Sequence, residues 1–219
     1  MKIPLSPRLQ ICCSFVHTGD RVADIGCDHG YLGIYLLKND IAQTVIASDI
    51  NKGPLDSAVR NSEKFGVRNK MSFYLSDGVR NIPREFDTMV CAGMGGDTMI
   101  SILEAAPWLK DSQYRLILQC QSKNGTLRRY LTDNGWKILQ EQVVKDGKFL
   151  YPVMEVIWQP GEILTPGQCF FPPTLIKNEH YEAYYEWVVK GLEIIVSNRK
   201  EAADPFMAEA LEELRKKEL

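Results

Sequence analysis

The sequence predicts an α/β protein in which helices cover both faces of a mostly parallel sheet and a pair of helices follows at the C-terminal end. Up to about residue 133, short apolar runs of strand length alternate with segments whose apolar residues recur at helical spacing. This alternation is typical of parallel sheets, because each connecting helix packs back onto the sheet. Residues 145–148 carry an Asp-Gly hairpin signal between two later strands, so we expect an antiparallel edge.

Most predicted elements end at a recognisable signal. The first strand ends in the turn at Gly26, and the second strand ends in an acid, Asp49. Gly66 stops the second helix, as glycine commonly does after the last helical turn. The predicted strands are 21–26, 44–49, 71–75, 86–92, 114–120, 136–144 and 149–158, and the predicted helices are 31–37, 54–65, a segment that follows Gly96 and runs to about Leu109, and 126–133.

The tail of the chain predicts two amphipathic helices behind a linker. Prolines and glycines punctuate residues 159–173, which is typical of a connecting segment. Apolar residues at spacings of three and four predict one helix from 178 to about 202. Asp204 before Pro205 predicts the N-cap and first turn of a second helix, and a short connection makes the pair an antiparallel hairpin. We therefore expect two domains, residues 1–158 and residues 159–219.

Composition excludes several classes of protein. Hydrophobic residues make up 45% and charged residues 25% of the chain, so disordered and fibrous classes are excluded. No apolar run approaches the roughly 20 residues that cross a bilayer, and the N-terminal segment lacks the apolar core of a signal peptide. The six cysteines form no CxxC pair, so we expect buried, reduced thiols and no metal site. These observations predict a cytoplasmic protein.

Net charge does not indicate a partner by itself. The chain carries −2 overall, with +2 in residues 1–159 and −4 in residues 160–219. Neither part has the strong basic excess that is typical of nucleic-acid binders. Any contact with phosphates must therefore come from a local patch.

Three acids stand at the ends of three successive predicted strands. Asp24 lies at the end of the first strand, Asp49 at the end of the second and Asp77 at the end of the third. Ligands of open α/β sheets bind outside the carboxyl ends of the strands, so these acids should share one site. Asp49 is placed to accept both hydroxyl groups of a ribose, and Asp77 to accept from an adenine amino group. Three acids at three successive strand ends suit a ligand that has an ammonium group, a ribose and an adenine. S-adenosylmethionine has all three.

The turn after the first strand discriminates between two nucleotide cofactors. The NAD fingerprint is G-x-G-x-x-G, in which a helix N-terminus faces a pyrophosphate. Here Asp28 stands at the middle glycine position. A carboxylate beside a pyrophosphate is unfavourable, whereas a carboxylate beside the ammonium or sulfonium group of S-adenosylmethionine is favourable. The residues therefore favour S-adenosyl-L-methionine over NAD.

The order of these motifs resembles that of class I S-adenosylmethionine-dependent methyltransferases over residues 15–158. Segments 6–9, 24–32, 47–55 and 92–96 are similar to those of the bacterial TrmK family. That family methylates N1 of the adenosine at position 22 of tRNA, and combines a Rossmann-like methyltransferase domain with a C-terminal helical hairpin. The resemblance implies a tRNA (adenine-N1)-methyltransferase. The cofactor contacts that we expect are Asp24, Gly26, Cys27, Gly30, Asp49, Ile50, Asp77, Gly78, Ala92, Gly93 and Met94.

The segment after the fourth strand favours a ring nitrogen as the methyl acceptor. Enzymes that methylate the exocyclic amine of adenine usually carry Asn/Asp-Pro-Pro-Tyr/Phe there, whereas this chain has Ala-Gly-Met-Gly at 92–95. Adenine N1 already presents an in-plane lone pair. Because the methylated base is cationic, a nearby carboxylate would stabilise it. Asp28 is the first catalytic candidate and His29 the second; the alternatives are that Asp28 faces only the cofactor and that His29 is a hydrogen-bonded turn residue.

A tRNA substrate needs further contacts. The target base must be unstacked, which costs roughly a few kcal/mol, and Tyr31 is a candidate for stacking on it, with a core position as the alternative. The backbone at Gly95 and Gly96 is a candidate for holding the base. Candidates for phosphate contact are Arg8, Lys123 and Arg128, with Lys2, Arg129, Lys190, Arg199, Lys200 and a stripe of Arg60, Lys64 and Arg68 as further basic residues.

Two other functions stay open at this point. A methyltransferase of the same fold could act on a small molecule, with the tail closing over the acceptor pocket. A domain that binds the cofactor without catalysis could use the helical hairpin to dock a protein partner. No feature of the sequence points to an obligatory protein partner.

Overall fold

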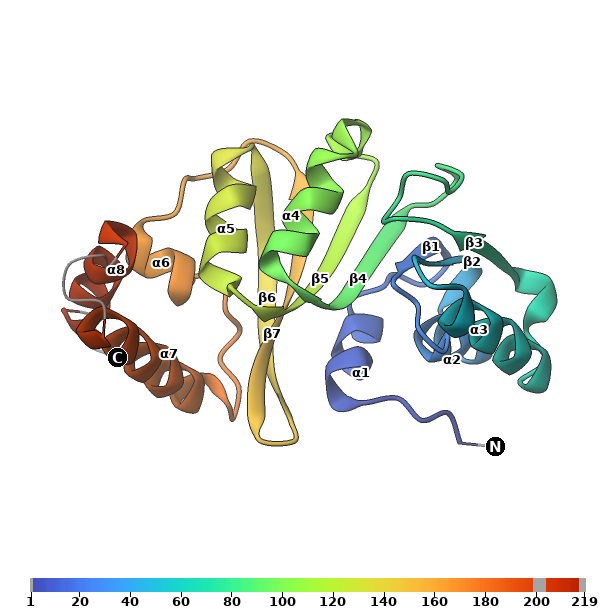
Figure 1. Cartoon of the computed structure of the whole chain (residues 1–219), viewed down its shortest axis with the longest axis horizontal. Coiled ribbons are helices and arrows are strands. Elements are labelled where there is room, and N and C mark those ends of the chain that lie inside the picture. The colour runs from blue at the N-terminus through green and yellow to red at the C-terminus, as the bar shows by residue number, and fades with distance from the viewer. Residues whose placement is uncertain (1, 199–203, 217–219) are drawn as a thin grey trace.

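The computed structural model describes residues 2–198 and 204–216. Their centre is a seven-stranded sheet with the order β3-β2-β1-β4-β5-β7-β6, in which all neighbours are parallel except β5–β7 and β7–β6 (Figure 1). The predicted α/β architecture with an antiparallel closing hairpin is therefore confirmed. The strands are β1 (Asp20–Ile25), β2 (Ala42–Asp49), β3 (Met71–Leu75), β4 (Thr88–Gly95), β5 (Arg115–Ser122), β6 (Trp136–Asp146) and β7 (Phe149–Trp158).

Helices cover the two faces of the sheet. On one face lie α4 (Gly96–Glu104), the short turn η2 (Pro107–Leu109) and α5 (Asn124–Asp133) (Figure 1). On the other face lie α1 (Pro7–Ser14), α2 (Tyr31–Lys38) and α3 (Lys52–Lys64), with the short turn η1 (Arg68–Lys70) before β3. The helix expected to reach about Leu109 thus ends at Glu104, and a separate turn follows it.

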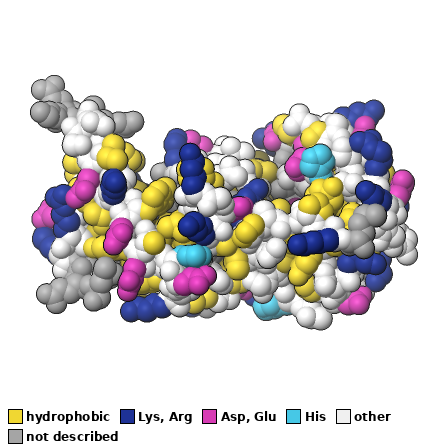
Figure 2. All heavy atoms as spheres, turned by 90° about the horizontal axis from the view of Figure 1, so that it is seen from below, with side chains coloured by type: hydrophobic (Ala, Val, Ile, Leu, Met, Phe, Trp, Pro, Cys, Tyr) yellow, Lys and Arg dark blue, Asp and Glu magenta, His cyan; other side chains and the backbone are white. Residues whose placement is uncertain are grey.

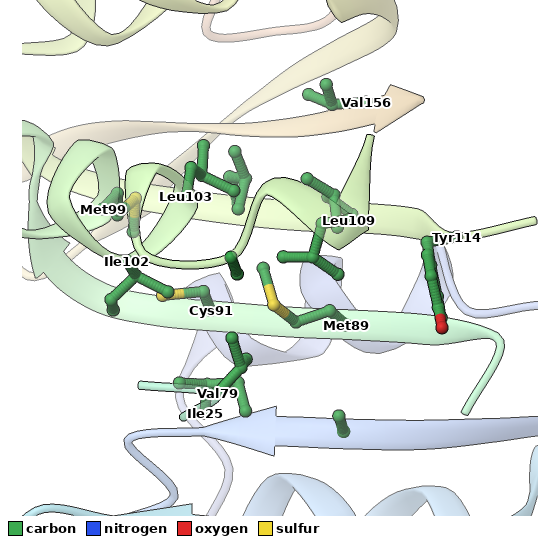
Figure 3. Packing of buried hydrophobic residues seen from close by; sticks show 14 of the residues in the cluster. Ile25, Val79, Met89, Cys91, Met99, Ile102, Leu103, Leu109, Tyr114 and Val156 are labelled. Carbon is green, nitrogen blue, oxygen red and sulfur yellow. The ribbon is translucent and has the colours of Figure 1, made fainter. Parts of the chain in front are cut away.

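Each face of the sheet has its own core. Between the sheet and α4, side chains such as Met89, Met99 and Leu103 interdigitate (Figure 3). A second cluster, which includes Ile34 and Val45, fills the space under α1, α2 and α3. All six cysteines are free and buried, as predicted, and burial raises the pKa of thiols such as that of Cys91, to about 12.

Two helices were not predicted. α1 begins at Pro7, after Ser6 in extended conformation, and α6 (Pro166–Phe170) lies inside the expected linker. Thr165 and Gln168 form a complete capping box at the start of α6. Pro at N1 and the Thr-x-x-Gln pair are both sequence signals for a helix start, but short helices leave little periodicity to support them.

The Ala-Gly-Met-Gly segment at 92–95, expected to follow the fourth strand, is part of β4. This strand continues to Gly95, and its pairing with β5 shifts register between Ala92 and Met94 and again before Gly95. Such bulges are common beside active sites, where they reorient backbone groups. The segment therefore carries bent strand backbone to the edge where ligands bind.

The tail forms the expected pair of helices, α7 (Tyr181–Asn198) and α8 (Pro205–Arg215). Near the start of α7, Tyr185 donates a hydrogen bond to the carbonyl of Leu214 near the end of α8 (2.7 Å), so the two helices run antiparallel. Asp204 caps α8 through Phe206 N (3.1 Å), as predicted. The end predicted for α7 near 202, and the candidates Arg199 and Lys200, lie outside the described residues.

The linker also joins the outer edge of the sheet. Glu141 of β6 exchanges backbone hydrogen bonds with Thr174 and Ile176 (3.0 and 2.8 Å). Asn178 donates from its side chain to the carbonyl of Val143 (2.8 Å). The tail is thus packed against the sheet along β6. Among the described residues, no helix is long and apolar enough to cross a membrane.

Candidate active site

The strand order reverses between β1 and β4, and a cavity lies there at the carboxyl ends of the strands. The chain runs β1-β2-β3 outward on one side, and β4 starts the other side. In open α/β sheets, this switch point is where ligands bind. The cavity measures about 90 Å³, and it is lined by Arg8, Leu9, Asp24, Gly26, Cys27, Asp28, His29, Tyr31, Leu32 and Ala92.

Asp24 lies at the floor of this cavity with an unpartnered oxygen. The residue is 4% exposed, and its Oδ2 has no hydrogen-bond partner. Burial raises the pKa of the Asp24 carboxyl to about 7, a backbone hydrogen bond from Gly33 opposes the rise, and the carboxylates of Asp49 and Asp28 add to it. A buried acid in this state is suited to a cationic group, which would restore its charged form.

Asp49 is buried at the end of β2 and organises the turn beside it. Its Oδ1 accepts a hydrogen bond from Asn51 N (2.8 Å), and its Oδ2 accepts one from Asp28 N (3.2 Å). Each carboxylate oxygen has a second lone pair, so both oxygens can accept a further donor. Ile50, the next residue, is 64% exposed, which leaves an apolar surface beside this carboxylate.

Three of the five residues in the turn of residues 26–30 have a left-handed backbone conformation. Gly26, Asp28 and Gly30 have φ angles of 72°, 49° and 71°. Asp is one of the few non-glycine residues that tolerate this region. The N–H groups of Gly26 and Cys27 both donate to the carbonyl of Ser48 (2.8 Å each), so the turn is fixed to β2. As a result, the Asp28 side chain points out of the turn and is 70% exposed.

The predicted glycines differ in what they leave room for. A Cβ on Gly26 would lie 2.3 Å from Met94 Cε, so this position allows β4 to approach the cavity. A Cβ on Gly30 would instead lie 2.9 Å from Ala58 Cβ, and one on Gly78 would lie 2.9 Å from Ile102 Cγ1. Gly30 and Gly78 therefore permit close packing of helices, and neither lines the cavity.

Arg8 and Gln119 hold the bulged end of β4. The fully buried Gln119 accepts hydrogen bonds at Oε1 from Arg8 Nη1 (2.8 Å) and from Gly93 N (3.1 Å). Arg8 also forms an ion pair with Asp146 (3.4 Å). Arg8 was expected at a phosphate, but the structure places it in the cavity wall. Gln119 was not predicted; a polar residue in an otherwise apolar strand is the signal that would have indicated it.

His29 and Tyr31 form the outer rim. His29 Nε2 lies 3.6 Å from Asp28 Oδ1, and its ring centroid lies 5.9 Å from that of Tyr31. The carbonyl of His29 accepts a hydrogen bond from Asn61 (2.9 Å), which ties the rim to α3. Tyr31 is half-buried and contacts Phe65 edge-on, so both the stacking and the core interpretation describe part of its surroundings.

Asp77 lies further along the same edge, at the end of β3. Its carboxylate is exposed and pairs with Arg80 (3.4 Å). Ser76 N donates to the carbonyl of Asp49 (3.0 Å), so the ends of β2 and β3 are joined. The three predicted acids are therefore arranged along one edge, with Asp24 innermost and Asp77 outermost.

The structure corrects the proposed RNA contact of Arg128. This residue is fully buried in an ion pair with Glu141, so it cannot belong to a basic surface cluster or touch a phosphate. Lys123 is exposed just after the end of β5 and pairs with Asp97 in the first turn of α4. Arg68 lies in η1 beyond the end of α3, so the predicted stripe on one helix is wrong.

A second hollow lies between the end of β5 and the tail. This groove has a volume of about 230 Å³ and is lined on one side by Ser122, Lys123 and Gly125. Its other side is α7, with Tyr184 and the half-exposed Trp187. Gly95 of β4 pairs with Ser122, so the groove adjoins the bulged strand end.

Comparison with known proteins identifies the family. A protein-family model described as a methyltransferase domain matches residues 5–154 of the chain. A Mycoplasma genitalium protein named as a candidate tRNA methyltransferase is 38% identical over 73% of this chain and 73% of its own length. The tRNA (adenine(22)-N(1))-methyltransferase of Bacillus subtilis is 34% identical over 70% of this chain and 65% of its own length. The crystal structure of the Bacillus subtilis tRNA methyltransferase TrmK is 28% identical, with a TM-score of 0.79 over 98% of this chain and 96% of that chain.

The chain belongs to the TrmK family of class I methyltransferases. Another member with known structure is from Streptococcus pneumoniae, in complex with S-adenosyl-L-methionine. It is 26% identical, with a TM-score of 0.83 over 95% of this chain and 97% of that chain.

The residues of this TrmK-family chain fit S-adenosylmethionine. The unpartnered Oδ2 of Asp24 is a buried acceptor that an ammonium group would satisfy. Gly26 leaves space where any side chain would meet Met94. Asp49 offers two buried carboxylate oxygens beside the exposed apolar Ile50, which suits a ribose next to a ring. These acceptors and the apolar surface beside them thus match the ammonium, ribose and ring parts of the cofactor.

Proposed function

We propose that this protein transfers a methyl group from S-adenosyl-L-methionine to N1 of adenosine 22 in tRNA. The Bacillus subtilis relative carries this activity in its name, and one solved relative holds this cofactor. The single observation in the structure that supports the proposal best is the pair of buried acids at neighbouring strand ends, Asp24 in the cavity and Asp49 bonded to its turn, beside the bulged end of β4.

Most of the predicted cofactor residues have a proposed role in binding, and Gly30 and Gly78 act through the packing of helices. Asp24 takes the ammonium group, and Asp49 takes the ribose hydroxyls. Asp77 accepts from the adenine amino group after it separates from Arg80, since the two are paired at 3.4 Å. Gly26, Cys27, Ala92, Gly93 and Met94 present backbone to the methionine part.

The bare backbone at the end of β4 suits a base that needs no activation. Residues 92–95 offer no side-chain carboxamide or carboxylate to an exocyclic amine. When bound, S-adenosylmethionine would supply an electrophilic methyl group. N1 would take it through its own lone pair while the methyl–sulfur bond breaks, so that S-adenosylhomocysteine leaves and the positive charge passes to the base. Asp28 then stands where its exposed carboxylate can lie beside the base as positive charge develops. His29 orients that carboxylate from 3.6 Å away.

The tail is the proposed tRNA-positioning domain, residues 159–219, against the catalytic domain of residues 1–158. Figure 2 shows a face on which basic and acidic side chains are interspersed, so we assign the tail a role in shape recognition rather than charge alone. Lys123 and Tyr31 on the sheet domain, with the backbone of Gly95 and Gly96, are the proposed contacts near the base. A tRNA substrate places the enzyme in the cytoplasm.

The test is methyl transfer to tRNA that lacks modification. The purified protein and labelled S-adenosylmethionine are incubated with a transcript that carries adenosine 22 and with one that carries guanosine there. Label in the first transcript alone supports the proposal. Label in both would show another target nucleotide. Label in small molecules only would favour a small-molecule methyltransferase, and binding without transfer would favour a non-catalytic module.

A further inference from the structure

Arg128 and Glu141 form a fully buried ion pair between α5 and β6. Both side chains have no exposed surface. Arg128 Nε lies 3.0 Å from each carboxylate oxygen of Glu141, and Nη2 lies 2.8 Å from Oε2. Because the guanidinium is planar and bonded at two points, its orientation is fixed.

Further hydrogen bonds of this pair go to the tail. Arg128 Nη1 donates to the carbonyl of Cys169 (2.9 Å), and Nη2 lies 3.5 Å from the hydroxyl of Tyr184. Glu141 accepts from the hydroxyl of Thr174 (3.2 Å). The pair therefore connects a helix and a strand of the sheet domain with three separate points of the tail.

Two members of this network also line the groove beside the active site. They are Arg128 and Tyr184, and Trp187 lies one turn further along α7. The opposite wall is Ser122, whose strand partner is Gly95 of β4. Arg128 thus links α7 to the helix that follows the strand next to the proposed acceptor edge.

Stability alone does not account for a pair of this kind. Removing two charges from water is costly, and apolar replacements of similar size are often equally stable. What an apolar contact lacks is direction. We propose that Arg128 and Glu141 are positioning residues for the RNA substrate, which hold α7 in one orientation so that a bound tRNA presents its adenine to the site. This inference rests on the proposed function.

The test compares apolar and polar versions of the pair in the full-length enzyme. The double variant Arg128→Met with Glu141→Leu removes both charges together and leaves no unpaired one. We expect kcat/KM for the tRNA transcript to fall tenfold or more, mainly through KM, while KM for S-adenosylmethionine stays within twofold. Arg128→Lys keeps the charge but lacks the planar guanidinium. Its kcat/KM for the tRNA transcript should lie between those of the wild type and the double variant.

A second ion pair provides a matched control. Arg115 and Glu155 join β5 to β7, and among the described residues the hydrogen bonds of their side chains go to each other and to Gln140 of β6. The double variant Arg115→Met with Glu155→Leu should leave KM for tRNA within twofold. If the KM for tRNA rises equally in both double variants, the cause is a general loss of packing. That result would overturn the inference.

The outcomes separate this inference from the proposed function. A wild-type protein that methylates no tRNA overturns the proposed function, and the inference falls with it. If the wild type is active and the Arg128/Glu141 double variant has the same kcat/KM for tRNA, the inference is overturned and the proposed function stands. If that double variant does not fold, Thr174→Val with Tyr184→Phe removes the two contacts to side chains of the tail, spares the pair and keeps the bond to the carbonyl of Cys169. An unchanged KM for tRNA there would also overturn it.

Discussion

At the scale of single residues, Asp24 links the site to the stability of the empty protein. Burial raises the pKa of its carboxyl from the ordinary value of 3.8 to about 7. Between these two values the folded state binds the proton more tightly than the unfolded state does. The contribution of Asp24 to folding stability therefore falls as pH rises through this window, and is constant above about 7.

This gives a prediction for Asp24→Asn. Between pH 5 and 7, the free energy of unfolding of the wild type should fall relative to that of the variant, and the difference should stay constant from pH 7.5 upward. Urea unfolding of both proteins at several pH values, without cofactor, measures it. If the difference in free energy of unfolding between the two proteins does not change between pH 5 and 7, Asp24 is charged over this whole range and the prediction is wrong.

Asp49 should contribute strongly to cofactor affinity. Alanine removes both acceptors for the ribose, and it also releases the two N–H groups that Asp49 binds. We expect Asp49→Ala to weaken S-adenosylmethionine binding by about 1–3 kcal/mol, as for charge-assisted hydrogen bonds. Calorimetry measures this, with the exposed acid Asp56 on α3 changed to alanine as the control. Unchanged affinity in a folded variant would exclude this placement of the ribose.

Asp28→Asn tests the electrostatic role of the exposed carboxylate. Asparagine tolerates the positive φ of this position, so the change removes charge and keeps the turn. We expect the single-turnover rate to fall more than cofactor affinity, and a tenfold loss corresponds to about 1.4 kcal/mol. Asp40 is a second exposed acid at positive φ, and Asp40→Asn should change neither quantity. Weak cofactor binding with a normal rate would assign Asp28 to the cofactor alone.

At the scale of elements, α6 depends on its cap. The hydroxyl of Thr165 accepts from Gln168 N (3.3 Å) and donates to Glu213 of α8 (2.6 Å), so one side chain starts α6 and joins it to the hairpin. Thr165→Ala should lower the free energy of unfolding by about 0.5–2 kcal/mol, the usual effect of losing an N-cap. Cofactor affinity should not change.

Chemical denaturation measures this effect against Ser101→Ala. The hydroxyl of Ser101 bonds a carbonyl within its own exposed helical turn, so its loss should alter stability by less than about 0.5 kcal/mol. Equal stability of both variants would mean that α6 is held by its packing and not by its cap.

At the scale of the whole molecule, the sheet and the long helices were predictable because burial imposes a period. The strands before residue 133 are short apolar runs, and α7 repeats its buried face at Tyr184, Val188 and Leu192. The helices α1 and α6 have eight and five residues, too few for a period to be distinct. The bulge in β4 depends on its pairing with β5, which no local pattern records.

In the candidate site, too, residues placed by local sequence patterns were predictable, and residues placed by distant partners were not. Asp24 and Asp49 were predictable because strand ends meet at one edge of a parallel sheet. Arg128 was placed wrongly because its partners are distant in the sequence: Glu141 is 13 residues away and Tyr184 is 56. Gln119 was missed for the same reason, since its role depends on Arg8, 111 residues before it. Charge type is local information, whereas burial is a property of the folded chain.

The pairing of the linker with β6 also affects how the protein behaves in concentrated solution. An outer strand with free N–H and C=O groups is a template on which other chains can add as further strands, and this is a common route to aggregation. Here Thr174 and Ile176 already occupy the backbone groups of Glu141 in the middle of that strand. A proteolytic cut before residue 174 that released the linker would uncover the strand, so clipped samples should precipitate before intact ones.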